Sequence, residues 1–241
     1  MTRAEIIAWL LDSDPAIRWQ VLRDLAHAPP AEVAAERGRV AREGWAGGLL
    51  DRQPPEGDWG DGQDFWMSTV HVLTLLRLCG VDPDDPRMRA AIELIQDRLR
   101  WLPLDNRPFF DGETEACING RIVSSGTYFG VRCDRLVAQL LGEQLEDGGW
   151  NCEAPPSKRS SFHSTICVLE GLLEHERAWG VSPAVSEARR RGEDYLLRRG
   201  LLRSVATGQV IDARWTCFTW PMNWHYDILR GLDHFRLAGA P

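Results

Sequence analysis

The sequence predicts an all-α protein in which helical hairpins repeat around a toroid of two concentric layers of helices. Two observations lead to this prediction. Segments that are apolar on most faces alternate with segments that carry one apolar stripe, as expected for a buried helix followed by a helix that covers it. The same layout also recurs along the chain, which is typical of repeat architectures.

Short capped helices fill the first 45 residues. Thr2 and Glu5 form a capping box that opens the first helix. Asp14-Pro15 opens the second helix, because proline fits the first helical position. We expect HEAT-like hairpins over 1–45, and the helices predicted in and just after this part cover residues 2–11, 15–28, 31–43 and 45–52.

Broadly and narrowly apolar helices alternate in the rest of the chain. Residues 65–78 and 162–175 are apolar on a broad arc, whereas 86–101 and 184–198 each carry one stripe. About eleven helices are expected in total. A closed ring of six hairpins needs twelve, so the toroid is expected to be open or to lack part of its last hairpin.

The chain contains no Pro-, Gly- or Ser-rich linker long enough to divide it into domains. We therefore expect a single toroid domain over 1–241, with the HEAT-like hairpins over 1–45 and the toroid repeats over 46–241. Convincing pairs of β-strands are not apparent in the sequence.

Composition excludes several classes of partner and location. The net charge is −7, and there is no basic run with interleaved aromatic residues, so nucleic acid is not an expected partner. The N-terminus lacks a signal peptide, and no apolar run has the length that crosses a bilayer. Six irregularly spaced cysteines in such a chain predict a cytoplasmic protein with reduced thiols.

The repeat is clearest in two segments that share a Q-x-x-x-G-x-W turn. Gln53 to Trp59 and Gln144 to Trp150 spell this turn, and each is followed by Ser-Thr and an apolar helix. A weaker third copy lies at 223–235, where ILRGL matches the VLEGL of the second copy. Each copy is expected to contain one hairpin.

Chemically active side chains gather where the second of these apolar helices begins. Cys152 and Glu153 lie on the turn before the helix, and His163 lies in its first turn because Ser160 or Ser161 can cap it. A thiol, a carboxylate and an imidazole can bind a metal or move protons. The alternative interpretation is a buried histidine bonded to a loop carbonyl.

These residues resemble a known superfamily, the squalene and terpene cyclases and the β-subunits of protein prenyltransferases. The Q-x-x-x-G-x-W turns are similar to the Gln/Trp repeats of squalene cyclases. The segment from Gly148 to Leu172 is similar to the prenyltransferase stretch that leads through a His-Thr-like pair into an inner helix. The resemblance covers roughly 50–235 and is closest to bacterial prenyltransferase/squalene oxidase repeat proteins of unknown activity.

The resemblance implies an α/α toroid and a zinc ion. In the prenyltransferases the histidine that His163 matches is a zinc ligand, and an Asp-x-Cys pair supplies two more. Glu115-Ala-Cys117 matches that pair with Glu in place of Asp. The expected metal ligands are therefore Cys117, His163, Cys152 and Glu115. The alternative is that Glu115 complements the helix dipole and Cys117 is a core residue.

The acidic D-x-D-D motif that donates a proton in squalene cyclases is spelled by residues 82–85. Its context is a loop between helices, followed by Pro86 at a helix start. We therefore expect Asp85 to cap that helix rather than to catalyse a reaction.

The expected function is that of a zinc-dependent toroidal enzyme that activates a thiol or hydroxyl substrate for transfer to or from an apolar, isoprenoid-like small molecule. The candidate catalytic residues are His225 and Asp111. Alternatives are a metal-free terpene-cyclase-like enzyme and a non-catalytic helical-repeat scaffold. The aromatic residues expected to line the substrate pocket are Trp66, Trp150, Phe162 and Trp224.

Overall fold

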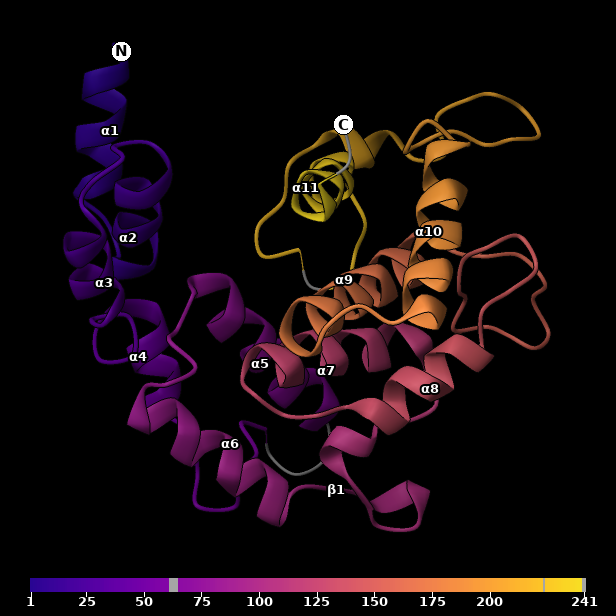
Figure 1. Cartoon of the computed structure of the whole chain (residues 1–241), viewed down its shortest axis with the longest axis horizontal. Coiled ribbons are helices and arrows are strands. Elements are labelled where there is room, and N and C mark those ends of the chain that lie inside the picture. Colours follow the sequence, from indigo (N-terminus) through magenta and orange to yellow (C-terminus); the bar gives the residue numbers. More distant parts are fainter. Residues whose placement is uncertain (61–64, 223, 240–241) are drawn as a thin grey trace. The chain divides into compact units, whose positions relative to one another are not determined.

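The computed structural model describes residues 1–60, 65–222 and 224–239, and for residues 65–67 and 103 it describes the backbone alone (Figure 1). Within these residues the secondary structure is helical, apart from one pair of two-residue strands and one isolated bridge. The all-α prediction is therefore confirmed. By their internal contacts the residues form two compact units, Met1–Leu99 and Arg100–Pro241. The toroid and its extent as one domain stay predictions.

The first unit contains six helices among its described residues. Thr2 and Glu5 form the expected capping box, and the carboxylate of Asp14 accepts the N–H of Ala16 at the start of the second helix. Asp85 caps the sixth helix by accepting the N–H of Arg87 at 2.9 Å, which confirms the predicted cap. The helices are α1 (Arg3–Leu11), α2 (Pro15–Asp24), α3 (Pro30–Arg37), α4 (Gly44–Asp51), α5 (Phe65–Cys79) and α6 (Pro86–Arg98).

The second unit contains five α-helices and short 3₁₀ turns among its described residues. Strands β1 (Arg100–Trp101) and β2 (Arg107–Pro108) form one antiparallel pair that the sequence did not reveal. The helices are α7 (Ala116–Tyr128), α8 (Asp134–Gly142), α9 (Phe162–Trp179), α10 (Pro183–Leu197) and α11 (Ile228–Ala238), with the 3₁₀ turns η1 (Leu102–Leu104), η2 (Phe109–Asp111) and η3 (Ala213–Thr216). No helix of the described part of the chain has the combination of length and apolar character needed to cross a membrane.

The repeated Q-x-x-x-G-x-W turns make the same hydrogen bonds in both units. The indole N–H of Trp59 donates to the carbonyl of Leu49, and that of Trp150 donates to the carbonyl of Leu140, each at 2.7 Å. Both carbonyls belong to the last turn of a helix, where backbone acceptors lack intrahelical donors. The tryptophan therefore closes the end of the preceding helix in each copy.

The glutamine of each turn joins the turn to the second helix that follows it in the chain. The side-chain amide of Gln53 donates to the carbonyl of Ala91 on α6 at 3.3 Å, and that of Gln144 donates to the carbonyl of Ala188 on α10 at 2.7 Å. These matching bonds support the repeat inferred from the sequence.

The hydroxyl of a threonine holds the backbone of each tryptophan. Thr69 accepts the backbone N–H of Trp59 at 3.3 Å, and Thr165 accepts that of Trp150 at 3.0 Å. The correspondence of Thr69 with Thr165 is therefore confirmed. In the sequence, more residues separate the tryptophan from the Ser-Thr pair in the second copy than in the first, and they include Cys152.

Helices α7 and α9 of the second unit lie side by side in direct backbone contact (Figure 1). A Cβ atom on Gly120 would lie 2.5 Å from the carbonyl oxygen of Cys167, and one on Gly171 would lie 2.5 Å from the carbonyl oxygen of Gly120. Only glycine allows backbones to approach this closely. A Cβ on Gly171 would also lie 3.2 Å from the Cβ of Val123, so the contact moves from Gly120 to Val123 on α7 as it moves from Cys167 to Gly171 on α9. The two helices therefore run parallel, and their first turns lie level.

A buried ion pair joins α9 to α11. Arg230 is 4% exposed, and its guanidinium donates to both carboxylate oxygens of Glu170 at 2.7 and 2.8 Å. Glu170 and Arg230 occupy the same position in the matching VLEGL and ILRGL segments. Equivalent positions of two copies therefore meet across these helices.

The glycine contact between α7 and α9 can be tested by adding one methyl group. Gly120→Ala places a Cβ against the Cys167 carbonyl, and we expect it to lower the free energy of unfolding by about 1–3 kcal/mol. Gly142→Ala is the matched control, since a Cβ there meets no atom within 4 Å. The control should gain up to about 1 kcal/mol because alanine favours the helix. Urea unfolding followed by circular dichroism measures both, and equal effects would contradict the close contact.

The role of the repeated tryptophan can be tested by removing its N–H. Trp150→Phe leaves the buried Leu140 carbonyl without its donor and opens space in the core. We expect it to lower the free energy of unfolding by about 2–4 kcal/mol. Trp9→Phe, at a side chain that is 67% exposed, should change it by less than about 0.5 kcal/mol. Similar losses in the two variants in urea unfolding would show that the indole bond does not support the repeat.

Candidate metal centre

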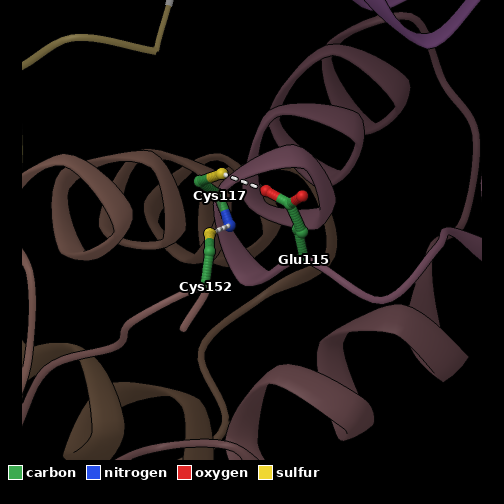
Figure 2. Close-up of side chains that lie close together, drawn as sticks. All are labelled: Glu115, Cys117 and Cys152. Atoms are coloured by element: carbon green, nitrogen blue, oxygen red, sulfur yellow. Dashed lines mark hydrogen bonds between the residues drawn. The ribbon is translucent and has the colours of Figure 1, made fainter. Parts of the chain in front are cut away.

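Three potential metal ligands meet at the start of α7. Glu115 precedes the helix, Cys117 lies in its first turn, and Cys152 comes from the loop that leads toward α9 (Figure 2). One carboxylate oxygen and the two sulfur atoms all lie within 4.8 Å of one another. Among the residues that the structure describes, this is a group of three with the chemistry and spacing to hold a metal ion.

Glu115 and Cys117 face the same side because the chain enters α7 in an extended conformation. Glu115 has φ −91° and ψ 122°, and its carboxylate lies 3.6 Å from the sulfur of Cys117. The preceding turn is fixed by the amide of Asn119, which accepts the N–H of Glu113 and donates to its carbonyl, both at 2.9 Å. In extended backbone, side chains two residues apart point the same way, so both groups can reach one ion.

Cys152 is held between the first turns of α7 and α9. Its sulfur accepts the backbone N–H of Cys117 and the hydroxyl of Ser164, each at 3.2 Å, and its own N–H donates to the Ser164 oxygen at 3.2 Å. Asn151 braces the loop by donating to the carbonyl of Arg159 at 2.7 Å. The level first turns of the two helices therefore bring this sulfur to the other two ligands.

The pKa values of the two thiols are shifted in opposite directions. Hydrogen bonds from Cys117 and then from Ser164 lower the pKa of Cys152, although burial opposes them. The hydrogen bond to Cys152 and burial raise the pKa of Cys117. Donors directed at a sulfur stabilise the thiolate, which is the form that binds metals and attacks electrophiles. The first sulfur to lose its proton is therefore that of Cys152.

His163 lies outside this group. Its Nδ1 accepts the backbone N–H of Tyr226 at 2.7 Å, and its ring packs edge-on against Trp215 and Trp224. Burial lowers the pKa of His163, so the ring is neutral and its single proton is on Nε2. In this arrangement one nitrogen accepts and the other is a donor, so neither offers a free lone pair to a metal.

His163 lies outside the group because of the direction in which its position on α9 points. His163 and Ser164 are neighbours in the first turn of α9, and successive residues of a helix point about 100° apart. Ser164 faces Cys152, so His163 points about 100° away from it and meets Tyr226 instead. A polar residue near a helix start was visible in the sequence, but its direction was not. Of the four predicted ligands, the structure brings together Glu115, Cys117 and Cys152.

The two predicted catalytic residues lie in other surroundings. Asp111 belongs to η2 and forms an ion pair with Arg135 at 2.7 Å. His225 stacks on Trp224 with ring centroids 3.9 Å apart and meets the ring of His163 edge-on at 5.6 Å. Neither belongs to the group of Glu115, Cys117 and Cys152. Their catalytic roles stay predictions.

The four predicted pocket residues divide among different environments. Trp150 is fully buried in the core, and Trp224 is 39% exposed. Phe162 lines a cavity of about 590 Å³ in the second unit, whereas the side chain of Trp66 lies outside the described residues. Half of the other residues that line this cavity lie on segment 199–215, where no helical periodicity marks them in the sequence. Its lining includes Asp147, Arg159, Ser160, His163, Tyr195, Arg199 and Trp215.

Comparison with family models, with curated proteins and with solved structures finds no match to this chain.

Because the pKa of Cys152 is lowered, we expect its alkylation to depend on pH, and we expect the hydroxyl of Ser164 to control this dependence. In protein treated with a chelator, alkylation of Cys152 by iodoacetamide should reach half its maximal rate at a lower pH than alkylation of an unperturbed thiol. Ser164→Ala removes a donor to the thiolate, so the pKa of Cys152 and this midpoint should rise. Ser204→Ala, which changes no contact of Cys152, is the control. Peptide mass spectrometry across a pH series measures the rates, and an unchanged midpoint in Ser164→Ala would contradict the prediction.

Proposed function

We propose that this protein binds a zinc ion through Glu115, Cys117 and Cys152. The observation that carries the proposal is the meeting of one carboxylate and two thiols from separate parts of the chain. A tetrahedral ion with ligands at about 2.0–2.3 Å has neighbouring ligand atoms roughly 3.3–3.8 Å apart. The 3.6 Å between Glu115 and Cys117 is within this range. Two sulfur ligands favour zinc over the hard ions magnesium and calcium.

Hydrogen bonds around the sulfurs support the same proposal. Ser164 and the N–H of Cys117 direct donors at Cys152, and such outer contacts orient metal ligands. Of the four ligands expected from the sequence, the proposed set keeps Glu115, Cys117 and Cys152 and leaves out His163. Glu115 is exposed, so the group is accessible from solvent.

The class of protein proposed here is a zinc-dependent enzyme of the prenyltransferase and squalene-cyclase repeat type. The matching bonds of Trp59 with Leu49 and of Trp150 with Leu140 support the repeat, and the parallel α7 and α9 suit the inner layer of a toroid. Three protein ligands leave one position for a substrate, as in catalytic zinc sites. Bound zinc would lower the pKa of a thiol or hydroxyl substrate for transfer to or from an apolar molecule.

The metal-free cyclase alternative has less support. The carboxylate of Asp85 caps α6 and forms an ion pair with Arg42 at 2.9 Å. Asp82 accepts the N–H of Asp84 within the same loop at 3.0 Å. These contacts give the acidic motif a structural role. A non-catalytic scaffold remains the alternative that the metal experiment decides.

Metal analysis of protein purified without chelator tests the site. We expect close to one zinc per chain in the wild type and none in Cys117→Ala or Cys152→Ala, because a thiolate ligand is lost. Glu115→Gln should weaken binding while leaving the fold intact, since Glu115 is exposed. Cys217→Ala is the control, because that exposed cysteine is outside the group. Inductively coupled plasma mass spectrometry measures the metal.

His163→Ala separates the two possible ligand sets, and we expect it to retain its zinc. Loss of zinc in this variant would return His163 to the site, and a wild-type protein that takes up no zinc would favour the scaffold. Cobalt substitution then tests the open position. A small thiol such as 2-mercaptoethanol should change the visible spectrum of the cobalt protein if one coordination position is free.

A further inference from the structure

A second site lies on the opposite side of the start of α9. The cavity of about 590 Å³ is bounded by the first turn of α9, the side of α10 and the segment 199–215. That segment folds back on itself through the bridge between Arg203 and Val210 and the bond from the Ile211 N–H to the Leu202 carbonyl at 2.9 Å. The lining does not include the three proposed zinc ligands.

Aromatic rings form one wall of the cavity. Phe162, Tyr195 and Trp215 are each less than 9% exposed, and the ring of Phe162 lies 5.5 Å from that of Tyr195 and 4.9 Å from that of Trp215. The Tyr195 hydroxyl donates to the carbonyl of Ser160 at 2.7 Å, so it is held in place. Such a wall offers flat apolar faces to a planar ligand.

The charged groups of the cavity leave an excess of one positive charge. Asp147 accepts the N–H of Ser160 at 3.1 Å, also accepts its hydroxyl, and lies 3.7 Å from the guanidinium of Arg199. Arg199 in turn lies over the ring of Tyr195 at 3.7 Å. Arg159 lines the same cavity and is exposed, and its side chain makes no ion pair with the described residues.

The side chains of His163 and Tyr195 carry no charge, so they leave the net positive charge of the cavity unchanged. Burial lowers the pKa of His163, so its ring is neutral near pH 7. Burial raises the pKa of Tyr195 to about 12, so its hydroxyl is also neutral. Asp147 and Arg199 balance each other, and Arg159 supplies the remaining charge.

We propose that this cavity binds a small aromatic carboxylate, whose ring lies against the aromatic wall and whose anionic group meets Arg159 and Arg199. Its volume suits such a ligand, because a cavity of about 150 Å³ holds benzene and ligand pockets are commonly about 300–1,000 Å³. Arginine binds carboxylates with two parallel hydrogen bonds, which fixes the orientation of the ligand. The proposal is independent of the zinc site.

Calorimetry with two probes of the same shape tests the proposal. We expect 2-naphthoate to bind with one molecule per chain and about tenfold more tightly than the neutral 2-naphthamide, because only the naphthoate carries the negative charge. Arg159→Gln should weaken naphthoate about fivefold or more and leave naphthamide nearly unchanged. Arg190→Gln removes the same charge from an exposed position on α10 outside the cavity, and it should leave both affinities unchanged.

Two further variants separate this site from its alternatives. Ala206→Trp adds bulk at an exposed lining residue and should abolish binding of both probes. Cys117→Ala removes a proposed zinc ligand and should retain naphthoate binding, so the two proposals can fail separately. Absence of saturable naphthoate binding, equal affinity for the two probes, or equal effects of Arg159→Gln and Arg190→Gln would overturn the proposal.

Discussion

The direct backbone contact between α7 and α9 determines where the chemistry of the second unit lies. Gly120 and Gly171 allow the two helices to approach without intervening side chains. Because the helices are parallel, their first turns lie at one level, and Cys117 and Ser164 can both reach Cys152. A longer separation between the helices would leave Cys152 without one of its donors. The close packing of α7 and α9 at these two glycines is therefore needed to bring Glu115, Cys117 and Cys152 together.

The first turn of α9 serves two different sites because its residues point in different directions. Ser164 faces the thiols, while Phe162 and His163 face the cavity. The sequence drew attention to this turn but combined its residues into one site. The structure separates them into a sulfur-containing group and an aromatic, cationic cavity. A ligand in the cavity and an ion at the thiols would both influence the position of the same helical turn.

The parts that the sequence predicted well depend on local chemistry. The caps of Thr2 and Asp85 follow from side chains that bond within three residues, and the repeated turns follow from a fixed spacing of Gln, Gly and Trp. The third helix is a counterexample, since it ends at Arg37 with Gly38 at its cap, six residues before the predicted end. The glycine was visible, but the apolar positions Ala31, Val33, Ala34 and Val40 continue past it and favoured a longer helix.

The parts that could not be predicted depend on contacts distant in sequence. His163 meets the N–H of Tyr226, 63 residues later, and no periodicity reveals such a pairing. Glu115, Cys117 and Cys152 were all predicted as ligands, the first two from the resemblance to the prenyltransferases. The packing of α7 against α9 then decides that Cys152 meets them and that His163 does not. The aromatic wall combines Tyr195 from α10 with Trp215 from the short 3₁₀ turn η3, and both are distant in sequence from Phe162.

The buried ion pair of Glu170 with Arg230 explains why His163 takes the place it does. Burial removes the guanidinium of Arg230 from water, and the charge of Glu170 outweighs this cost, so the pKa of Arg230 is raised. A misplaced α11 would leave the buried guanidinium of Arg230 without its carboxylate partner, which costs several kcal/mol. The pair therefore fixes the register of α11 on α9. Arg230 also donates to the carbonyl of His225 at 2.7 Å, next to Tyr226. The same register thus presents the Tyr226 N–H to His163, and it holds that imidazole on the side of the cavity, away from the thiols.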